Sequence, residues 1–563
     1  MKKLQLITIC LFSFFVSNAQ VPALQWAKQM GGNGTDRGQC IVTDALGNVY
    51  TTGSFQGVAD FDPGVGVVNL TSNGSDDIFI SKLDVNGNLV WAKSMGDTLN
   101  EYGFSLAVDA GGNVYTTGSF QGTVDFDPSA LTTTLSSAGN EDVFITKLDA
   151  TGNLVWAKSM GGTTSDFGRS IAVDASGVYT TGFFDGTSDL DPGAATVNLT
   201  SAGLYDIFIS KLDAGGNFVW AKNMGGTNYD VGNSIALDAS GNVYTTGYFS
   251  GSADLDPGVA TANATSSGLN DIFISKLDGA GNFVWAKNMG GSLNDIAFSM
   301  TIDATGNIYT AGTFGGNPDM DPGAGSFSLA SNGSNDVFIS KLTGAGNFVW
   351  AKSFGGTTAD YVYSVDTDPS GNVYTAGYFQ GTVDFDPGVA TNSITSAGNY
   401  DIFISKLDGS GNFIWANSMG GTMRDYAYSL AVDASGNIYT TGWFEGVADL
   451  DPGNGTFNLT STGAFDTYVL KIFQSPLGLI ENSSESNFSI YPNPSKEILN
   501  VTTTSFAANN LKIQLLNSLG QIILEEKMTV QTIELNIKSF ANGLYFVKIV
   551  SDTDVITKKI VKE

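Results

Sequence analysis

Four short phrases decide the fold: SIALD at 234–238, VYTTGYF at 243–249, DIFISKL at 271–277 and FVWAK at 283–287. The second phrase is rich in β-branched and aromatic residues, which favour strands. Gly-Asn pairs at 241–242 and 281–282 separate the first phrase from the second and the third from the fourth. Gly and Asn supply the positive φ of tight hairpins, so the unit predicts four antiparallel strands.

This unit repeats along most of the chain. Several of its strands are apolar on successive residues, so both faces of each small sheet must be covered. A ring of sheets, each lying between two neighbours, provides that cover, whereas no segment has the 3.6-residue period of a helical solenoid. The Trp-Ala-Lys phrase, or a near match, recurs in steps of 65 residues, with one step of 64, at Trp26, Trp91, Trp156, Trp220, Trp285, Trp350 and Trp415.

The two ends of the repeat region are each incomplete. A lone fourth-type strand at 24–28 stands before the first full unit, and the last unit stops after its third strand at 466–472. If the N-terminal strand completes the last unit, neither fragment leaves an unpaired sheet edge. We therefore predict an all-β protein in which residues 20–474 form a seven-bladed β-propeller of four-stranded antiparallel blades, closed by the N-terminal strand.

The repeat resembles a known family. The phrase VDASGNIYTTG at 432–442 and its counterparts are similar to the bacterial propeller repeats called SBBP, over roughly residues 20–474. The resemblance implies a seven-bladed propeller. It implies no activity, because that family has no single one.

The N-terminus predicts export. Met1-Lys2-Lys3, the apolar run 4–16 and the small residues 17–19 are typical of a signal peptide spanning 1–19. We expect no transmembrane segment, since no later stretch approaches the roughly 18 apolar residues that one requires. The formal net charge of −29 argues against nucleic acid as a partner, because phosphates are neutralised by clusters of Lys and Arg.

The C-terminal part has a different composition. Residues 475–486 lack every repeat phrase and indicate a linker, and short strands from 487 to 563 predict a small antiparallel β-sandwich. This stretch resembles the type A C-terminal sorting domain of the type IX secretion system. The resemblance implies a type IX secretion partner, passage across the outer membrane, and surface attachment or release. The residues that carry it include Tyr491, Pro492, Asn493, Pro494, Gly543, Lys558 and Lys559.

The composition does not favour an enzyme. The chain has no histidine, which removes the commonest general base and most zinc sites. Cys40 occupies a position where the other repeats have Ser, so we interpret it as a small residue at a blade start. Repeated acids are typical of a scaffold, because a catalytic pair needs two different environments. We predict no catalytic residue; a carboxylate-based carbohydrate-active enzyme remains an alternative.

Each repeat carries an Asp-x-Asp-Pro phrase with two open interpretations. Asp and Pro, with the Gly that usually follows, form turns, whereas two carboxylates on a loop are suitable ligands for Ca²⁺, the one cofactor we consider. A further acid precedes each first strand, on the same face of the propeller as the Asp-x-Asp loops. We expect backbone N–H donors or cations to offset the electrostatic repulsion among these carboxylates. The candidate metal ligands are Asp60, Asp62, Asp125, Asp127, Asp189, Asp191, Asp254, Asp256, Asp319, Asp321, Asp384, Asp386, Asp449 and Asp451, and the further acids are Asp36, Glu101, Asp166, Asp230, Asp295, Asp360 and Asp425.

Residues that break the repeat are the candidate ligand-binding residues. Aromatic platforms with scattered polar groups suit sugars or peptides, although packing between blades is the alternative interpretation. The sequence therefore predicts a cell-surface or secreted adhesion protein that binds a glycan or a protein; a structural surface-layer protein is a further alternative. The candidates are the three arginines of the chain and four variable aromatics: Arg37, Arg169, Arg424, Phe183, Tyr248, Tyr378 and Trp443.

Overall fold

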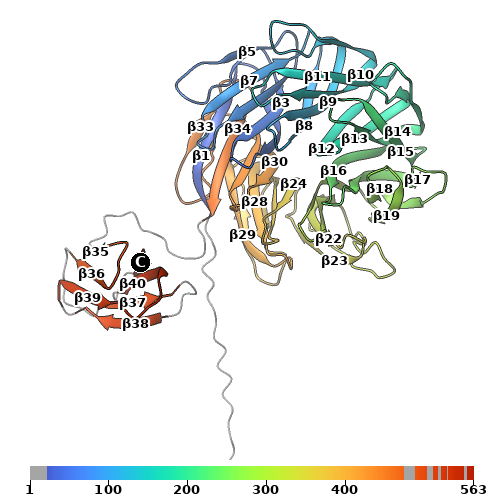
Figure 1. Cartoon of the computed structure of the whole chain (residues 1–563). Helices are drawn as coiled ribbons and strands as arrows, with labels where there is room; N and C mark the ends of the chain where they lie inside the picture. Colours follow the sequence, from blue (N-terminus) through green and yellow to red (C-terminus); the bar gives the residue numbers. More distant parts are fainter. Residues whose placement is uncertain (1–21, 475–487, 504–510, 518–521, 529, 551–554) are drawn as a thin grey trace, which may run out of the picture. The chain divides into compact units, whose positions relative to one another are not determined.

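The computed structural model describes residues 22–474, 488–503, 511–517, 522–528, 530–550 and 555–563. These residues form strands and no helix (Figure 1). One compact unit comprises Val21–Gln474, and the strands after residue 487 belong to another. The predicted signal peptide (1–19) and linker (475–486) lie outside the described residues.

The repeats form groups of four antiparallel strands in which each strand pairs with the next one along the group (Figure 1). These pairings confirm the four predicted strands of the unit. The first six groups are β2 (Arg37–Thr43), β3 (Val49–Phe55), β6 (Asp77–Leu83) and β7 (Leu89–Met95); β8 (Glu101–Val108), β9 (Val114–Asp125), β10 (Thr134–Leu148) and β11 (Leu154–Gly162); β12 (Phe167–Asp174), β13 (Gly177–Asp189), β14 (Asn198–Leu212) and β15 (Phe218–Gly226); β16 (Asp230–Leu237), β17 (Val243–Asp254), β18 (Asn263–Leu277) and β19 (Phe283–Met289); β20 (Asp295–Ile302), β21 (Ile308–Phe314), β22 (Asp336–Leu342) and β23 (Phe348–Phe354); and β24 (Tyr361–Thr367), β25 (Val373–Phe379), β28 (Asp401–Leu407) and β29 (Phe413–Gly421).

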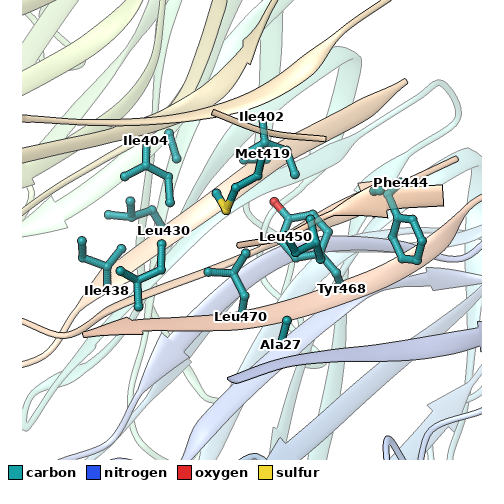
Figure 2. Close-up of a cluster of buried hydrophobic side chains, with 14 of the residues drawn as sticks. Ala27, Ile402, Ile404, Met419, Leu430, Ile438, Phe444, Leu450, Tyr468 and Leu470 are labelled. Carbon is teal, nitrogen blue, oxygen red and sulfur yellow. The ribbon is translucent and has the colours of Figure 1, made fainter. Parts of the chain in front are cut away.

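The last group takes its fourth strand from the other end of the repeat region. It consists of β30 (Asp425–Val432), β31 (Ile438–Phe444), β34 (Asp466–Gln474) and β1 (Pro22–Gly32). Strand β1 pairs antiparallel with β34, with Ala27 opposite Leu470. Figure 2 shows Ala27 and Leu470 in one cluster with Ile402 and Met419 of the preceding group. The N-terminal strand therefore lies beside the last repeat, as the sequence predicts.

The repeated Trp and Lys link most groups to the next. The Trp220 indole donates a hydrogen bond to the Gly279 carbonyl of the following group (3.4 Å), and Lys211 donates to the same carbonyl (3.3 Å) while lying over the Tyr179 ring. The acceptor belongs to the hairpin between the third and fourth strands. In the last group that hairpin is replaced by the two separate strands β34 and β1, and the buried Trp415 indole nitrogen has no hydrogen-bond partner among the described residues.

The long connection of each repeat forms an outer ribbon that explains its extra length. The ribbon pairs with the fourth strand of the preceding group, as in Gly225 opposite Asp254. The ribbon of the first repeat pairs in the same way with β1, where Gly31 faces Asp60. Some ribbons are separate short strands: β4 (Val58–Asp60), β5 (Asn69–Thr71), β26 (Thr382–Asp384), β27 (Ser393–Thr395), β32 (Val447–Asp449) and β33 (Asn458–Thr460).

A line of serine hydroxyls joins the first strands of neighbouring groups. Each Ser Oγ accepts the backbone N–H of the next first strand, at 3.0–3.3 Å. Cys40 replaces the serine in β2, and its Sγ lies 3.9 Å from the Leu106 carbonyl oxygen. The accepting serine and the residue whose N–H donates are Ser105 and Ile171, Ser170 and Ile235, Ser234 and Met300, Ser299 and Val365, Ser364 and Leu430, and Ser429 and Ile41.

The C-terminal unit has two antiparallel sheets that share one core. Its Tyr-Pro-Asn-Pro phrase holds the last strand, because Asn493 accepts the Val561 N–H (2.8 Å) and donates to the Lys559 carbonyl (3.1 Å). Gly543 begins the neighbouring strand. The sheets are β35 (Phe488–Tyr491), β36 (Ile498–Thr503) and β39 (Thr532–Asn536), and β38 (Ile522–Lys527), β37 (Lys512–Leu516), β40 (Gly543–Val550) and β41 (Val555–Lys562).

Candidate ligand-binding pocket and buried acids

A cavity of 460 Å³ lies among the first strands of the groups. Each first strand contributes one partly exposed residue to its lining, and this residue immediately precedes the Ser or Cys described above. The seven residues are Gln39, Phe104, Arg169, Asn233, Phe298, Tyr363 and Tyr428. The remaining lining residues are Phe183, Tyr205, Val231, Tyr248 and Ile296.

A β-bulge places each of these seven residues. The pairing of the first and second strands skips one residue in every group, for example between Gly168 and Ser170 in β12. The skipped residue is the one that lines the cavity. Because a bulge adds one residue and redirects a side chain, it can supply a cavity residue without shifting the register of the buried neighbours.

Arg169 is the only charged residue in this lining. Its guanidinium lies over the rings of Phe104 (4.7 Å), Phe183 (5.3 Å) and Phe167 (5.6 Å). Its Nε atom is buried and has no hydrogen-bond partner in the described chain. Burial lowers the pKa of Arg169, because a charged group loses hydration there. The site therefore holds a partly desolvated cation without a carboxylate partner among the described residues.

Tyrosines of the last two groups line another part of the cavity and join an aromatic cluster beside it. Tyr363 stacks on Tyr428 with ring centroids 4.6 Å apart, and Tyr378 lies 5.8 Å from Tyr363. Trp443 packs against Tyr426 with ring centroids 3.9 Å apart. Burial raises the pKa of the Tyr363 and Tyr428 phenols, so both hydroxyls stay protonated at neutral pH and can donate hydrogen bonds.

The cavity collects three of the seven predicted ligand-binding residues: Arg169, Phe183 and Tyr248. Tyr378 and Trp443 lie in the adjoining aromatic cluster. The other two arginines have acidic partners instead. Arg37 lies 3.7 Å from Asp76, and Arg424 forms an ion pair with Glu445 at 2.9 Å.

Of the seven bulge residues, only Arg169 is among the candidate ligand-binding residues that the sequence predicts. From the first repeat to the last the bulge position reads Gln, Phe, Arg, Asn, Phe, Tyr and Tyr, and Ser follows it in every repeat but the first, where Cys40 follows. A variable position directly before this Ser or Cys is the signal that could have identified it.

The Asp-x-Asp carboxylates bind their own loops. Asp254 Oδ1 accepts the N–H groups of Asp256 (3.1 Å) and Ala262 (2.8 Å), and Asp256 Oδ1 accepts that of Gly258 (2.8 Å). Equivalent bonds recur in the other six repeats. Within the described ranges, no group of three or more acidic or cysteine side chains is arranged to hold a metal ion.

The acids that precede the first strands are buried rather than displayed on a surface. Asp295 is 0% exposed and accepts the N–H groups of Gly291 (2.6 Å) and Gly315 (3.3 Å). Burial and the nearby Asp271 raise the pKa of Asp295 to about 7. Asp271 is also fully buried, its Oδ1 has no partner in the described chain, and burial raises its pKa to about 6. Backbone N–H donors thus offset only part of the electrostatic repulsion between these carboxylates. The raised pKa values favour the protonated, uncharged acids, which reduces the repulsion further.

Comparisons with known proteins agree with these two units. Residues 489–563 match the secretion system C-terminal sorting domain family, and residues 25–54, 219–249 and 349–378 match the SBBP beta-propeller repeat. The sorting domain indicates export across the outer membrane, to the cell surface or the extracellular medium, and implies interaction with the type IX secretion machinery. No helix in the described residues has the length and apolar character needed to span a membrane.

Two curated relatives are much longer than the chain. An uncharacterized WD repeat-containing protein of Acanthamoeba polyphaga mimivirus is 24% identical over 500 residues, which cover 75% of this chain and 36% of the relative. The regulatory protein FlaEY of Caulobacter vibrioides is 30% identical over 177 residues, which cover 31% of this chain and 18% of the relative. The chain therefore spans about a third or less of these relatives' lengths.

Solved structures resemble the chain only weakly. PorZ, a surface component of the type IX secretion system of Porphyromonas gingivalis, is 11% identical with a TM-score of 0.14, over 95% of this chain and 100% of that one. A protein of unknown function from Bacteroides thetaiotaomicron is 10% identical with a TM-score of 0.17, over 71% and 95%. At these scores the likeness carries no argument about function.

Proposed function

We propose that this protein is a non-enzymatic binding protein of the cell surface or the extracellular medium, which adheres to a glycan or a protein through the cavity at the first strands. The observation that carries the proposal is the set of seven bulge residues. Each repeat directs one side chain into the same space, and those side chains differ between repeats in size, charge and polarity. A scaffold needs no such variation, whereas recognition of an asymmetric ligand does.

We further infer that the seven groups are the blades of a closed propeller. Two links between the last group and the first support this: Ser429 accepts the Ile41 N–H at 3.1 Å, and the first outer ribbon pairs with β1, the fourth strand of the last group. Each has a counterpart between successive groups elsewhere in the repeat region. A closed ring explains why the cavity draws one residue from every group.

The cavity's chemistry favours binding over hydrolysis. Glycoside hydrolysis normally requires two carboxylates about 5 to 9 Å apart on either side of the substrate. None of the described lining residues is acidic. The Asp-x-Asp phrases carry backbone hydrogen bonds within their loops, which favours the turn interpretation over calcium binding.

A glycan-array survey of the purified protein, followed by isothermal titration calorimetry, tests the proposal. We expect an extracellular glycan or protein to bind, and the Phe298→Ala/Tyr363→Ala double variant to lose that binding while keeping its Tm within a few degrees. The control is Phe457→Ala, since Phe457 is 40% exposed on an outer loop. Equal binding by both variants would reject the cavity as the site, and turnover of a bound glycan would favour the carbohydrate-active enzyme.

A further inference from the structure

We propose, resting on the binding function above, that the cavity recognises an acidic sugar: a uronic acid residue whose carboxylate is held by the Arg169 guanidinium and whose ring lies against the aromatic lining.

The first argument is the missing partner of Arg169. An arginine whose charge is partly removed from water normally pairs with a carboxylate, because desolvation without a partner is costly. The two other arginines of the chain are more exposed to water and still have acidic partners, Asp76 and Glu445. Arg169 has phenylalanine rings below it and a buried Nε that donates to no described group. A bound carboxylate would accept from the guanidinium in the two-pronged geometry that arginine favours.

The second argument is the charge of the rest of the protein. A formal net charge of −29 repels anions from most of the surface. A lone cation in a lining without acids is therefore the place where an anion can bind. The cavity is also partly enclosed by apolar rings, and a lower effective dielectric strengthens the attraction between guanidinium and carboxylate.

The third argument concerns the body of the ligand. The cavity's volume of 460 Å³ lies in the range of small-molecule sites, about 300–1,000 Å³. Phe298, Tyr363 and Tyr428 offer ring faces on which the C–H face of a sugar can pack. The Asn233 amide nitrogen donates to Ala297 at 2.9 Å, which leaves its oxygen to accept from a hydroxyl. Together with Gln39, these polar groups suit a sugar better than an aliphatic acid.

Titration calorimetry with three probes tests the assignment on the full mature chain. The probes are tri-galacturonic acid, neutral galactotriose, and an acetylated tripeptide with a free C-terminal carboxylate. We expect the acidic sugar to bind at least tenfold more tightly than the other two. Arg169→Gln should remove that preference, and Arg169→Lys should recover only part of it, because lysine keeps the charge and loses the fork. The control is Lys276→Gln, which removes one positive charge at the Tyr244–Asp238 contact, remote from the cavity lining.

Stability without ligand provides a second readout. If Arg169 is kept for a ligand, Arg169→Met should raise the Tm of the free protein, since an unpaired cation is replaced by an apolar chain of similar length. If the arginine serves only to pack the phenylalanines, the same change should lower the Tm. Lower Tm together with unchanged sugar binding overturns the assignment.

The probe results separate this inference from the proposed function. Neutral and acidic sugars could bind equally, with binding unchanged by Arg169→Gln and lost in Phe298→Ala/Tyr363→Ala. That result overturns the acidic-sugar assignment and leaves the binding function in place. Binding of the tripeptide but not of the sugars overturns it in favour of a peptide ligand. Absence of binding by all three probes also overturns it, while the array survey decides the function.

Discussion

Replacing Asp271 with asparagine should stabilise the protein at alkaline pH and make little difference in acid. Asp271 is fully buried, its Oδ2 accepts the Ser267 N–H at 3.0 Å, and its Oδ1 has no partner in the described chain. Burial raises its pKa from 3.8 to about 6. The folded protein thus binds this proton more tightly than the unfolded chain does. The stabilisation is complete below about pH 4, and it is lost as the pH rises through about 6.

The size of the effect follows from the shift. One pKa unit corresponds to about 1.4 kcal/mol, so ionising Asp271 in the folded state costs at most about 3 kcal/mol at pH 8. Asparagine keeps an acceptor for Ser267 and carries no charge at any pH. Asp271→Asn should therefore exceed the wild type by about 1–3 kcal/mol in free energy of unfolding at pH 8, and the gap should close near pH 4.

Differential scanning calorimetry of both proteins at pH 4.5 and pH 8 measures this gap. Asp278→Asn serves as a control of opposite sign. Hydrogen bonds from Asn282 lower the pKa of Asp278, so its carboxylate stabilises the fold above the unfolded pKa, and its removal should lower the Tm at pH 8. A lower Tm for Asp271→Asn at pH 8, or a gap equal at both pH values, would refute the reasoning about buried acids.

Three further changes test other parts of the account. Cys40→Ser should supply the hydroxyl that accepts the N–H of the next first strand in the other groups. We expect it to add about 1 kcal/mol to the free energy of unfolding, measured by urea titration, and a loss of stability would contradict this. Trp220→Phe should lower the Tm more than Trp415→Phe, because Trp220 donates a hydrogen bond to the next group and the Trp415 indole has no partner among the described residues; equal losses would show that this bond is immaterial. Chelation with EDTA, or addition of millimolar Ca²⁺, should leave the Tm unchanged, and a rise with Ca²⁺ would restore the calcium interpretation of the Asp-x-Asp loops.

The repeat phrases predicted the strands and hairpins because their signals are local. Residues 243–249 and 271–277 contain the β-forming residues of β17 and β18, and Gly-Asn pairs mark the turns. The N-terminal strand could be assigned to the last repeat because each fragment lacks what the other provides. These inferences require only the order of residues along the chain.

The site was less predictable because it depends on register and on neighbours distant in sequence. A bulge at Arg169 shifts the pairing of the first and second strands by one residue, and the amino-acid composition of these strands does not predict it. The burial of Asp295 results from the outer connection of its own repeat and the acid of the preceding one. The acids therefore look like surface loop residues in the sequence and are interior residues in the fold.

The central proposal is that β1, by pairing with β34, closes the ring of groups. Hydrogen–deuterium exchange of the mature protein, followed by mass spectrometry of peptides, measures it directly. The account predicts that amides in Pro22–Gly32 exchange as slowly as those of the interior fourth strand Phe283–Met289, because both are paired within a sheet. Exchange of Pro22–Gly32 at the rate of an unpaired terminus would contradict the closed ring.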